Sequence, residues 1–150
     1  MTAEVISSWI VETFDHVVAK GAWGETSFFV NPGRALPSGA YFATIKQKDG
    51  DNDRASALDR EAVYRLNFGP GRRAFEELFG SPPARPGKGK IIEGDYDFKA
   101  LDVIMPHPIY GWMSWMCVLN PSRRTFELCQ PLLYFAHAKA SAAAEKRLGR

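Results

Sequence analysis

Apolar residues recur at helical spacing near both ends of the chain. In the first segment these residues are Val5, Ile6, Trp9, Ile10, Phe14 and Val17. Because this period matches a helical turn, it predicts an amphipathic helix over about residues 3–15, capped by Thr2. Near the end of the chain, Asn120 and Pro121 are the residue types of an N-cap and a first helical position, so we expect a helix to begin there. Pro131 is expected to kink that helix or split it in two.

Short segments with β-strand character lie between these two helices. They cover residues 17–19, 26–30, 41–46, 63–68, 101–105 and 112–119, with a further start at Ile91 and Ile92. The segment 112–119 has no alternating polar residues, which predicts a central strand with both faces covered. A short helix is expected over about residues 72–79. The order of helix, strands, helix, strands and helix predicts an α+β domain with a mostly antiparallel sheet.

The strand predicted at residues 63–68 carries polar side chains on one face. Its alternation places Tyr64, Leu66 and Phe68 on one side and Val63, Arg65 and Asn67 on the other. A guanidinium suits a carboxylate or phosphate, and an amide suits the polar edge of a ligand, so Arg65 and Asn67 are candidate ligand-binding residues. The alternative for Arg65 is an ion pair with nearby Asp59 or Glu61.

Two segments are expected to be loops. Residues 48–60 are charged and lack periodicity, which predicts an exposed loop, and residues 81–90 are rich in Pro, Gly and basic residues, which predicts a mobile one. In the first loop, Asp51, Asp53 and Arg54 are candidate ligand-binding residues if the loop folds over a cleft. Its acidic residues do not match a calcium-binding loop, because arginines stand at the sixth and twelfth positions.

Residues 105–115 form the most individual stretch of the sequence. Prolines on both sides of His107 restrict the backbone and exclude a helix. A held imidazole beside aromatic rings can stack on a flat ligand, donate a hydrogen bond or transfer a proton near neutral pH. The neighbouring aromatic residues are Tyr110, Trp112 and Trp115. The alternative is that the tryptophans fill the core and that His107 bonds a backbone carbonyl.

Composition and charge narrow the class of protein. The chain has 150 residues, of which 45% are hydrophobic, and this predicts a single domain over residues 1–150 with frayed ends near 1–2 and 145–150. A net charge of +2 disfavours a strongly basic nucleic-acid-binding face. The polar start, the absence of an apolar run of membrane-spanning length, and two cysteines in apolar surroundings lead us to expect a cytoplasmic protein with reduced thiols.

No metal or cofactor is predicted. The histidines and cysteines lack the spacing of zinc ligands. Gly69 and Gly71 belong to a G-x-G-x-x-A sequence that follows a predicted strand. The strand is polar and the helix after it is short, so we prefer a turn that begins the helix over a nucleotide-binding fingerprint.

Four segments carry a resemblance to known proteins. They are Trp-Gly-Glu-Thr-Ser-Phe-Phe at 23–29, Phe-Ala-Thr-Ile at 42–45, Arg-Leu-Asn-Phe at 65–68, and the strand that follows Trp115. In this order, over about residues 5–140, the chain resembles MmcQ/YjbR-like proteins. It is more similar still to an uncharacterised bacterial family with the same Trp-Gly-Glu-Thr and His-Pro-x-Tyr-Gly-Trp-Met-Ser-Trp signatures. The resemblance implies a two-layer α+β fold with a curved antiparallel sheet, the double-wing fold, whose members are often labelled as predicted DNA-binding.

Three functions remain open, and the sequence does not decide whether the protein is an enzyme. In a ligand- or partner-binding domain, a cleft would be lined by Arg65, Asn67, His107, Tyr110, Trp112 and Glu25. In a small enzyme, His107 and Glu25 are candidate catalytic residues, acting as general acid or base beside Arg65. In a DNA-binding protein, phosphate contacts would come from Arg72, Arg73, Arg85, Lys88, Lys90, Arg123 and Arg124. A small molecule is favoured over nucleic acid as the partner, no membrane is expected, and a homodimer stays open.

Overall fold

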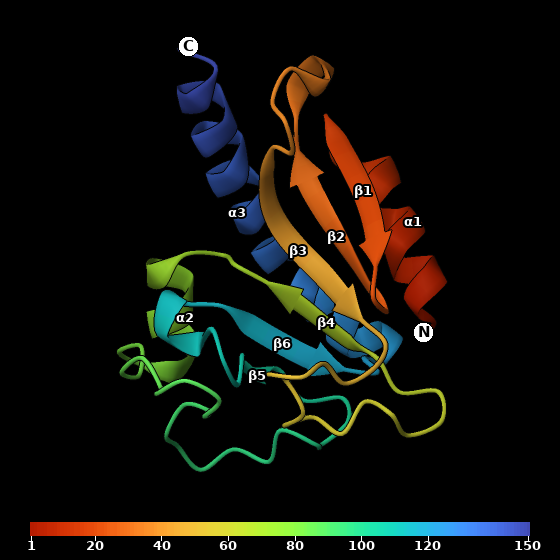
Figure 1. The fold of residues 1–150 in the computed structure, drawn as a ribbon, viewed down its shortest axis with the longest axis vertical. Helices are drawn as coiled ribbons and strands as arrows, with labels where there is room; N and C mark the ends of the chain where they lie inside the picture. The colour runs from red at the N-terminus through yellow and green to blue at the C-terminus, as the bar shows by residue number, and fades with distance from the viewer.

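The computed structural model describes residues 1–150 as three α-helices and a six-stranded sheet (Figure 1). The helices are α1 (Ala3–Thr13), α2 (Arg72–Phe79) and α3 (Arg123–Arg147). The strands are β1 (Val17–Ala22), β2 (Glu25–Val30), β3 (Ala40–Lys46), β4 (Arg65–Phe68), β5 (Met105–Pro106) and β6 (Met116–Leu119). Short 3-10 turns occupy Pro32–Arg34 and Gly111–Met113. The first helix begins as predicted, with the Thr2 hydroxyl accepting from the Val5 amide.

The sheet has the strand order β1-β2-β3-β4-β6-β5, and every neighbouring pair is antiparallel. This arrangement confirms the predicted α+β class. Since β4 is antiparallel to both of its neighbours, the turn at Gly69–Gly71 does not belong to the parallel βαβ unit that a dinucleotide-binding fingerprint requires. The preferred interpretation, a turn that leads into α2, agrees with the structure.

Helices α1 and α3 cover one face of the sheet (Figure 1). The side chains between the two layers form one cluster of 22 buried residues. Its largest members include Ile6, Ile10, Phe28, Leu66, Phe68, Met116, Phe126 and Leu133. None of the three helices combines the length and the hydropathy that a membrane-spanning helix needs.

The opposite face is covered over only part of its width. Long loops gather at the β5–β6 side of the sheet (Figure 1), where they pack against β6 and reach Arg65 on β4. Two small apolar clusters hold the loops in place: Ile92, Phe98, Met105 and Cys117 form one, and Leu58, Val63 and Leu119 form the other. Strand β6 is therefore buried on both faces, which confirms the prediction for this segment, although the strand itself covers only Met116–Leu119.

Several predicted boundaries are wrong. Residues Ile91, Ile92 and 101–104 are not strands. The N-cap of α3 is Ser122, whose hydroxyl accepts from the Thr125 amide, and not Asn120. The Asn120 side chain instead accepts from the Tyr64 amide and donates to the Ala62 carbonyl, which ties the end of β6 to the start of β4.

Pro131 does not split the last helix, because α3 runs unbroken from Arg123 to Arg147. A proline inside a helix removes one backbone hydrogen bond and crowds the preceding turn. In α3 this cost is offset by a continuous buried stripe, to which Cys129 and Leu133 belong on either side of the proline.

Candidate functional site

A cavity of about 530 Å³ lies on the face of the sheet that the helices do not cover. Side chains from β2, β3 and β4 form its base. One wall is the loop after β3, and another is the segment between β5 and β6. Residues that are far apart in the sequence therefore meet around one space of the size that holds small ligands.

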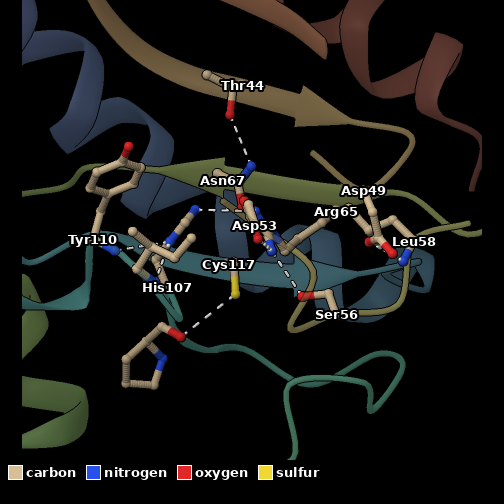
Figure 2. A network of polar contacts seen from close by, with 12 residues as sticks. Thr44, Asp49, Asp53, Ser56, Leu58, Arg65, Asn67, His107, Tyr110 and Cys117 are labelled. Atoms are coloured by element: carbon tan, nitrogen blue, oxygen red, sulfur yellow. Dashed lines mark hydrogen bonds and ion pairs between the residues drawn. The ribbon is translucent and has the colours of Figure 1, made fainter. Parts of the chain in front are cut away.

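Beneath this cavity lies Arg65, whose side chain is completely buried at 0% exposure. Its guanidinium donates to both carboxylate oxygens of Asp53, at 3.1 and 2.5 Å. It also donates to Ser56 Oγ at 2.9 Å and to Asn67 Oδ1 at 2.7 Å (Figure 2). A two-pronged carboxylate and two neutral acceptors thus offset the cost of removing this cation from water.

Asn67 extends the network across the sheet. Its Nδ2 donates to Thr44 Oγ1 at 2.9 Å, and the two residues are direct partners in the β3–β4 register. Arg65 and Asn67 point to the same face because they stand two residues apart on one strand, as the alternation predicted. Since Thr44 Oγ1 accepts this bond, its own hydrogen is free to point into the cavity.

The ion-pair partner of Arg65 is Asp53, so the predicted pairing with Asp59 or Glu61 is wrong. The loop after β3 folds back on itself to deliver this carboxylate. Asp49 accepts from the Leu58 amide at 2.8 Å, and the Asp49 amide donates to Asp59 at 2.9 Å. Residues 48–60 form a loop with mostly exposed charged side chains, as predicted, but Ser56 and Leu58 are buried and anchor it against the sheet.

Of the three ligand-binding candidates in that loop, only Asp53 lies at the cavity. Asp51 and Arg54 point into solvent, where they approach each other to 4.0 Å. An exposed pair of this kind contributes little to stability. Trp112 is also displaced from its predicted role, because it packs under the Arg85 guanidinium, 4.7 Å from the ring centroid, and does not line the cavity.

His107 is 3% exposed and lies at the edge of the Arg65 network. Its Nδ1 accepts hydrogen bonds from the backbone amides of Ile109 and Tyr110, both at 3.1 Å. The imidazole therefore folds its own loop into a turn, and the expected bond to a backbone carbonyl is not formed. Burial, with Arg65 and Lys46 nearby, holds the pKa of His107 well below its ordinary value.

Aromatic rings form one side of the cavity. Tyr41 and Trp115 lie with ring centroids 5.2 Å apart, and Tyr110 lies 5.1 Å from the His107 ring. Gly69 is required behind this wall, because a Cβ there would stand 2.6 Å from the Trp115 indole. The rings offer a flat, partly exposed surface that suits the body of a planar ligand.

Two further charged residues line the cavity. Glu25 and Lys46 are direct partners in the β2–β3 register, yet neither forms an ion pair. Glu25 was a candidate from the sequence, and it shares the cavity with His107 and Asn67.

Sequence reasoning missed Tyr41, Thr44, Lys46 and Ser56 as parts of this region. Alternation along β3 is the signal that could have placed Thr44 and Lys46 on one face. Tyr41 joins that face only because the β2–β3 register shifts by one residue between Phe28 and Phe29, and no local pattern signals such a bulge.

Neither cysteine thiol lines the cavity. Burial raises the pKa of both Cys117 and Cys129 to about 12, and Cys117 Sγ donates weakly to the Pro106 carbonyl at 3.7 Å. At pH 8 a thiol with this pKa is ionised in roughly one molecule in ten thousand.

We expect native protein to be inert to a thiol-specific disulfide reagent and denatured protein to react at two sites. Rapid modification of one thiol in native protein would contradict this.

Comparisons with known proteins identify the family of this chain but no biochemical activity. Neither a curated protein nor a solved structure matches the chain. One family model does match, over residues 1–149, and it is described as a family of unknown function. Because that match covers almost the whole chain, this protein belongs to the DUF6194 family.

Proposed function

We propose that this protein binds a small molecule in the cavity between the sheet and the loop after β3. The observation that carries the proposal is the buried Arg65 network, three of whose members, Asp53, Asn67 and His107, also line the cavity. A buried ion pair is often no more stabilising than apolar side chains of similar volume. A network that opens onto a cavity is therefore better explained by a ligand than by stability alone.

The size and chemistry of the cavity support this proposal. Its volume of about 530 Å³ falls in the range of small-ligand sites. Such sites combine apolar and aromatic walls with a few oriented polar groups, and here Tyr41 and Trp115 supply rings while Thr44 and His107 supply polar atoms.

An acid–base enzyme that uses His107 and Glu25 is a weaker candidate. Both residues line the same cavity, as such an enzyme needs. However, the lone pair of His107 Nδ1 is occupied by two backbone amides, and this imidazole does not ionise readily. It is suited to donate a hydrogen bond and poorly suited to accept a proton.

DNA binding, which the resemblance to the double-wing fold implies, is also weaker. Arg72 and Arg73 follow the Phe68 end of β4, whereas Arg123 and Arg124 follow the opposite, Leu119 end of the β4–β6 pair. The first two arginines already pair with glutamates one helical turn away. These four arginines thus lie at opposite ends of the β4–β6 pair and do not form one phosphate-binding face.

Thermal unfolding in the presence of a panel of anionic, neutral and cationic metabolites tests the proposal. A compound that binds the native state raises the melting temperature. Replacement of Ser27 by tryptophan, S27W, fills the cavity from β2 without touching Arg65, and is expected to abolish the shift. S8W, on the exposed surface of α1 over the other face, is the matched control and should keep it. No shift with any compound, or an equal shift in S27W, would refute binding at this cavity.

A further inference from the structure

The backbone contacts of His107 fix its tautomer. Because Nδ1 accepts from two amide hydrogens, it must carry a lone pair, and the hydrogen of the neutral ring then sits on Nε2. A charged imidazolium is excluded by the same contacts, since its Nδ1 hydrogen would face both amides. His107 therefore presents an N–H donor at Nε2.

This donor has no acceptor within the protein. The only polar atom near Nε2 is Arg65 Nη2, 3.3 Å away, and a guanidinium nitrogen also donates and never accepts. One hydrogen of Nη2 goes to Asp53, and the other is left without a partner. His107, from the segment after β5, lines the cavity, and Arg65 of β4 lies buried directly beneath it, so that two N–H groups without an acceptor stand side by side (Figure 2).

The charges around this donor pair favour an anion. Arg65 and Lys46 are the charged groups that act on the imidazole, and both are positive. Asp53 faces the guanidinium, which already neutralises it. Glu25 is the one remaining carboxylate of the cavity, and it lies opposite Lys46 on β2. The charges that act on the His107 ring are therefore positive, and the cavity also offers the free hydroxyl hydrogen of Thr44 as a donor.

We infer that the ligand of this cavity carries an oxyanion that accepts from His107 Nε2, approaches Arg65 Nη2 and Lys46, and places its body against Tyr41 and Trp115. The inference rests on the proposed small-molecule function and specifies the chemical class of the ligand. A carboxylate on a flat ring and a phosphate group share the required oxygen acceptors. The aromatic wall favours the carboxylate on a ring.

Two substitutions of His107 separate the roles of its two nitrogens. In His107→Asn, the amide oxygen stands at the position of Nδ1 and preserves the turn, but the donor at Nε2 is lost. In His107→Gln, the amide nitrogen stands at the position of Nε2 and preserves the donor, but the turn loses its acceptor. If His107 only stabilises the turn, His107→Asn should retain ligand affinity and His107→Gln should lose it. If His107 donates to the ligand, His107→Gln should retain affinity and His107→Asn should lose it.

The experiment titrates ¹⁵N-labelled protein with benzoate, benzamide and inorganic phosphate, and follows the imidazole signals of His107 by NMR. Free protein is expected to show the Nε2–H tautomer. Benzoate should shift the Nε2 signal and bind at least about tenfold more tightly than neutral benzamide, since a hydrogen bond to a charged group is worth more than one decade in affinity. His107→Asn should weaken benzoate by about tenfold or more, and His107→Gln by no more than about threefold.

Binding of both anions, or of phosphate alone, supports an oxyanion site. The anion that binds more tightly shows whether the site prefers a ring carboxylate or a phosphate group. The inference is overturned by an Nδ1–H tautomer, by equal binding of benzamide and benzoate, or by no shift with either anion up to about 10 mM. These failures are distinct from failure of the proposed function. A neutral or cationic compound that stabilises wild-type protein but not S27W would leave the cavity a binding site without an oxyanion.

Discussion

Replacement of Arg65 by methionine is expected to lower the free energy of unfolding by about 3–5 kcal/mol. Methionine fills a similar volume, so the loss comes from the polar groups that Arg65 now satisfies. The Asp53 carboxylate would lose both of its bonds, and Ser56 and Asn67 would each lose a donor. A buried polar group left without a partner costs more than the hydrogen bond was worth.

Urea and thermal denaturation measure this effect. For a chain of 150 residues, about 3–5 kcal/mol corresponds to a fall in melting temperature of roughly 6–20 °C. Arg72→Met is the matched control, because it makes the same chemical change at an exposed pair with Glu76 on α2. The control should stay within about 0.5 kcal/mol of wild type.

A fall of less than about 1 kcal/mol in Arg65→Met would show that the network contributes little to stability. The double variant Arg65→Met with Asp53→Asn refines the result. If the stranded carboxylate is the main cost, removal of its charge should restore part of the lost stability. If the double variant is no more stable than Arg65→Met, the loss of stability comes from the unsatisfied side chains of Ser56 and Asn67 instead.

Acidification is expected to destabilise the wild-type protein through His107. Its pKa is lowered in the folded state by burial and by two nearby cations. In the unfolded chain the same imidazole has its ordinary value near 6.5 and takes up a proton as the pH falls below it. The unfolded state therefore binds more protons than the native state, and the free energy of unfolding decreases from about pH 6.5 downward.

Between pH 7 and pH 5 the expected loss is about 2 kcal/mol, with a limiting slope of about 1.4 kcal/mol per pH unit. His107→Asn supplies the reference, since it retains an acceptor for the Ile109 and Tyr110 amides and has no titrating ring. Subtraction of its pH profile removes the contributions of all other groups. A difference profile that is flat between pH 7 and pH 5 would mean that the folded protein accepts a proton at His107.

Local periodicity determined the elements and which side chains share a face. Helix α2 has the predicted residues 72–79, and the alternation in β4 correctly put Arg65 and Asn67 on the face opposite Leu66 and Phe68. Such patterns can be read from a sequence because a helix turn and a strand pleat repeat over a few residues. The same reasoning correctly predicted that β6 is covered on both sides.

The partners of these side chains depended on contacts that no local pattern contains. Asp53 reaches Arg65 because Leu58 and the Asp49 carboxylate fold the preceding loop over the sheet. His107 reaches the same guanidinium from 42 residues further along the chain.

Local sequence patterns were therefore enough to predict the antiparallel α+β class, the polar face of β4 and the unusual character of the segment around His107. Three features emerged from long-range folding alone: Asp53 and not Asp59 neutralises Arg65, Trp112 turns away from the cavity, and two backbone amides donate to His107 Nδ1. The physical reason is that periodic burial is a property of short segments, whereas ion pairing and tautomer choice depend on which distant loops close over the same place.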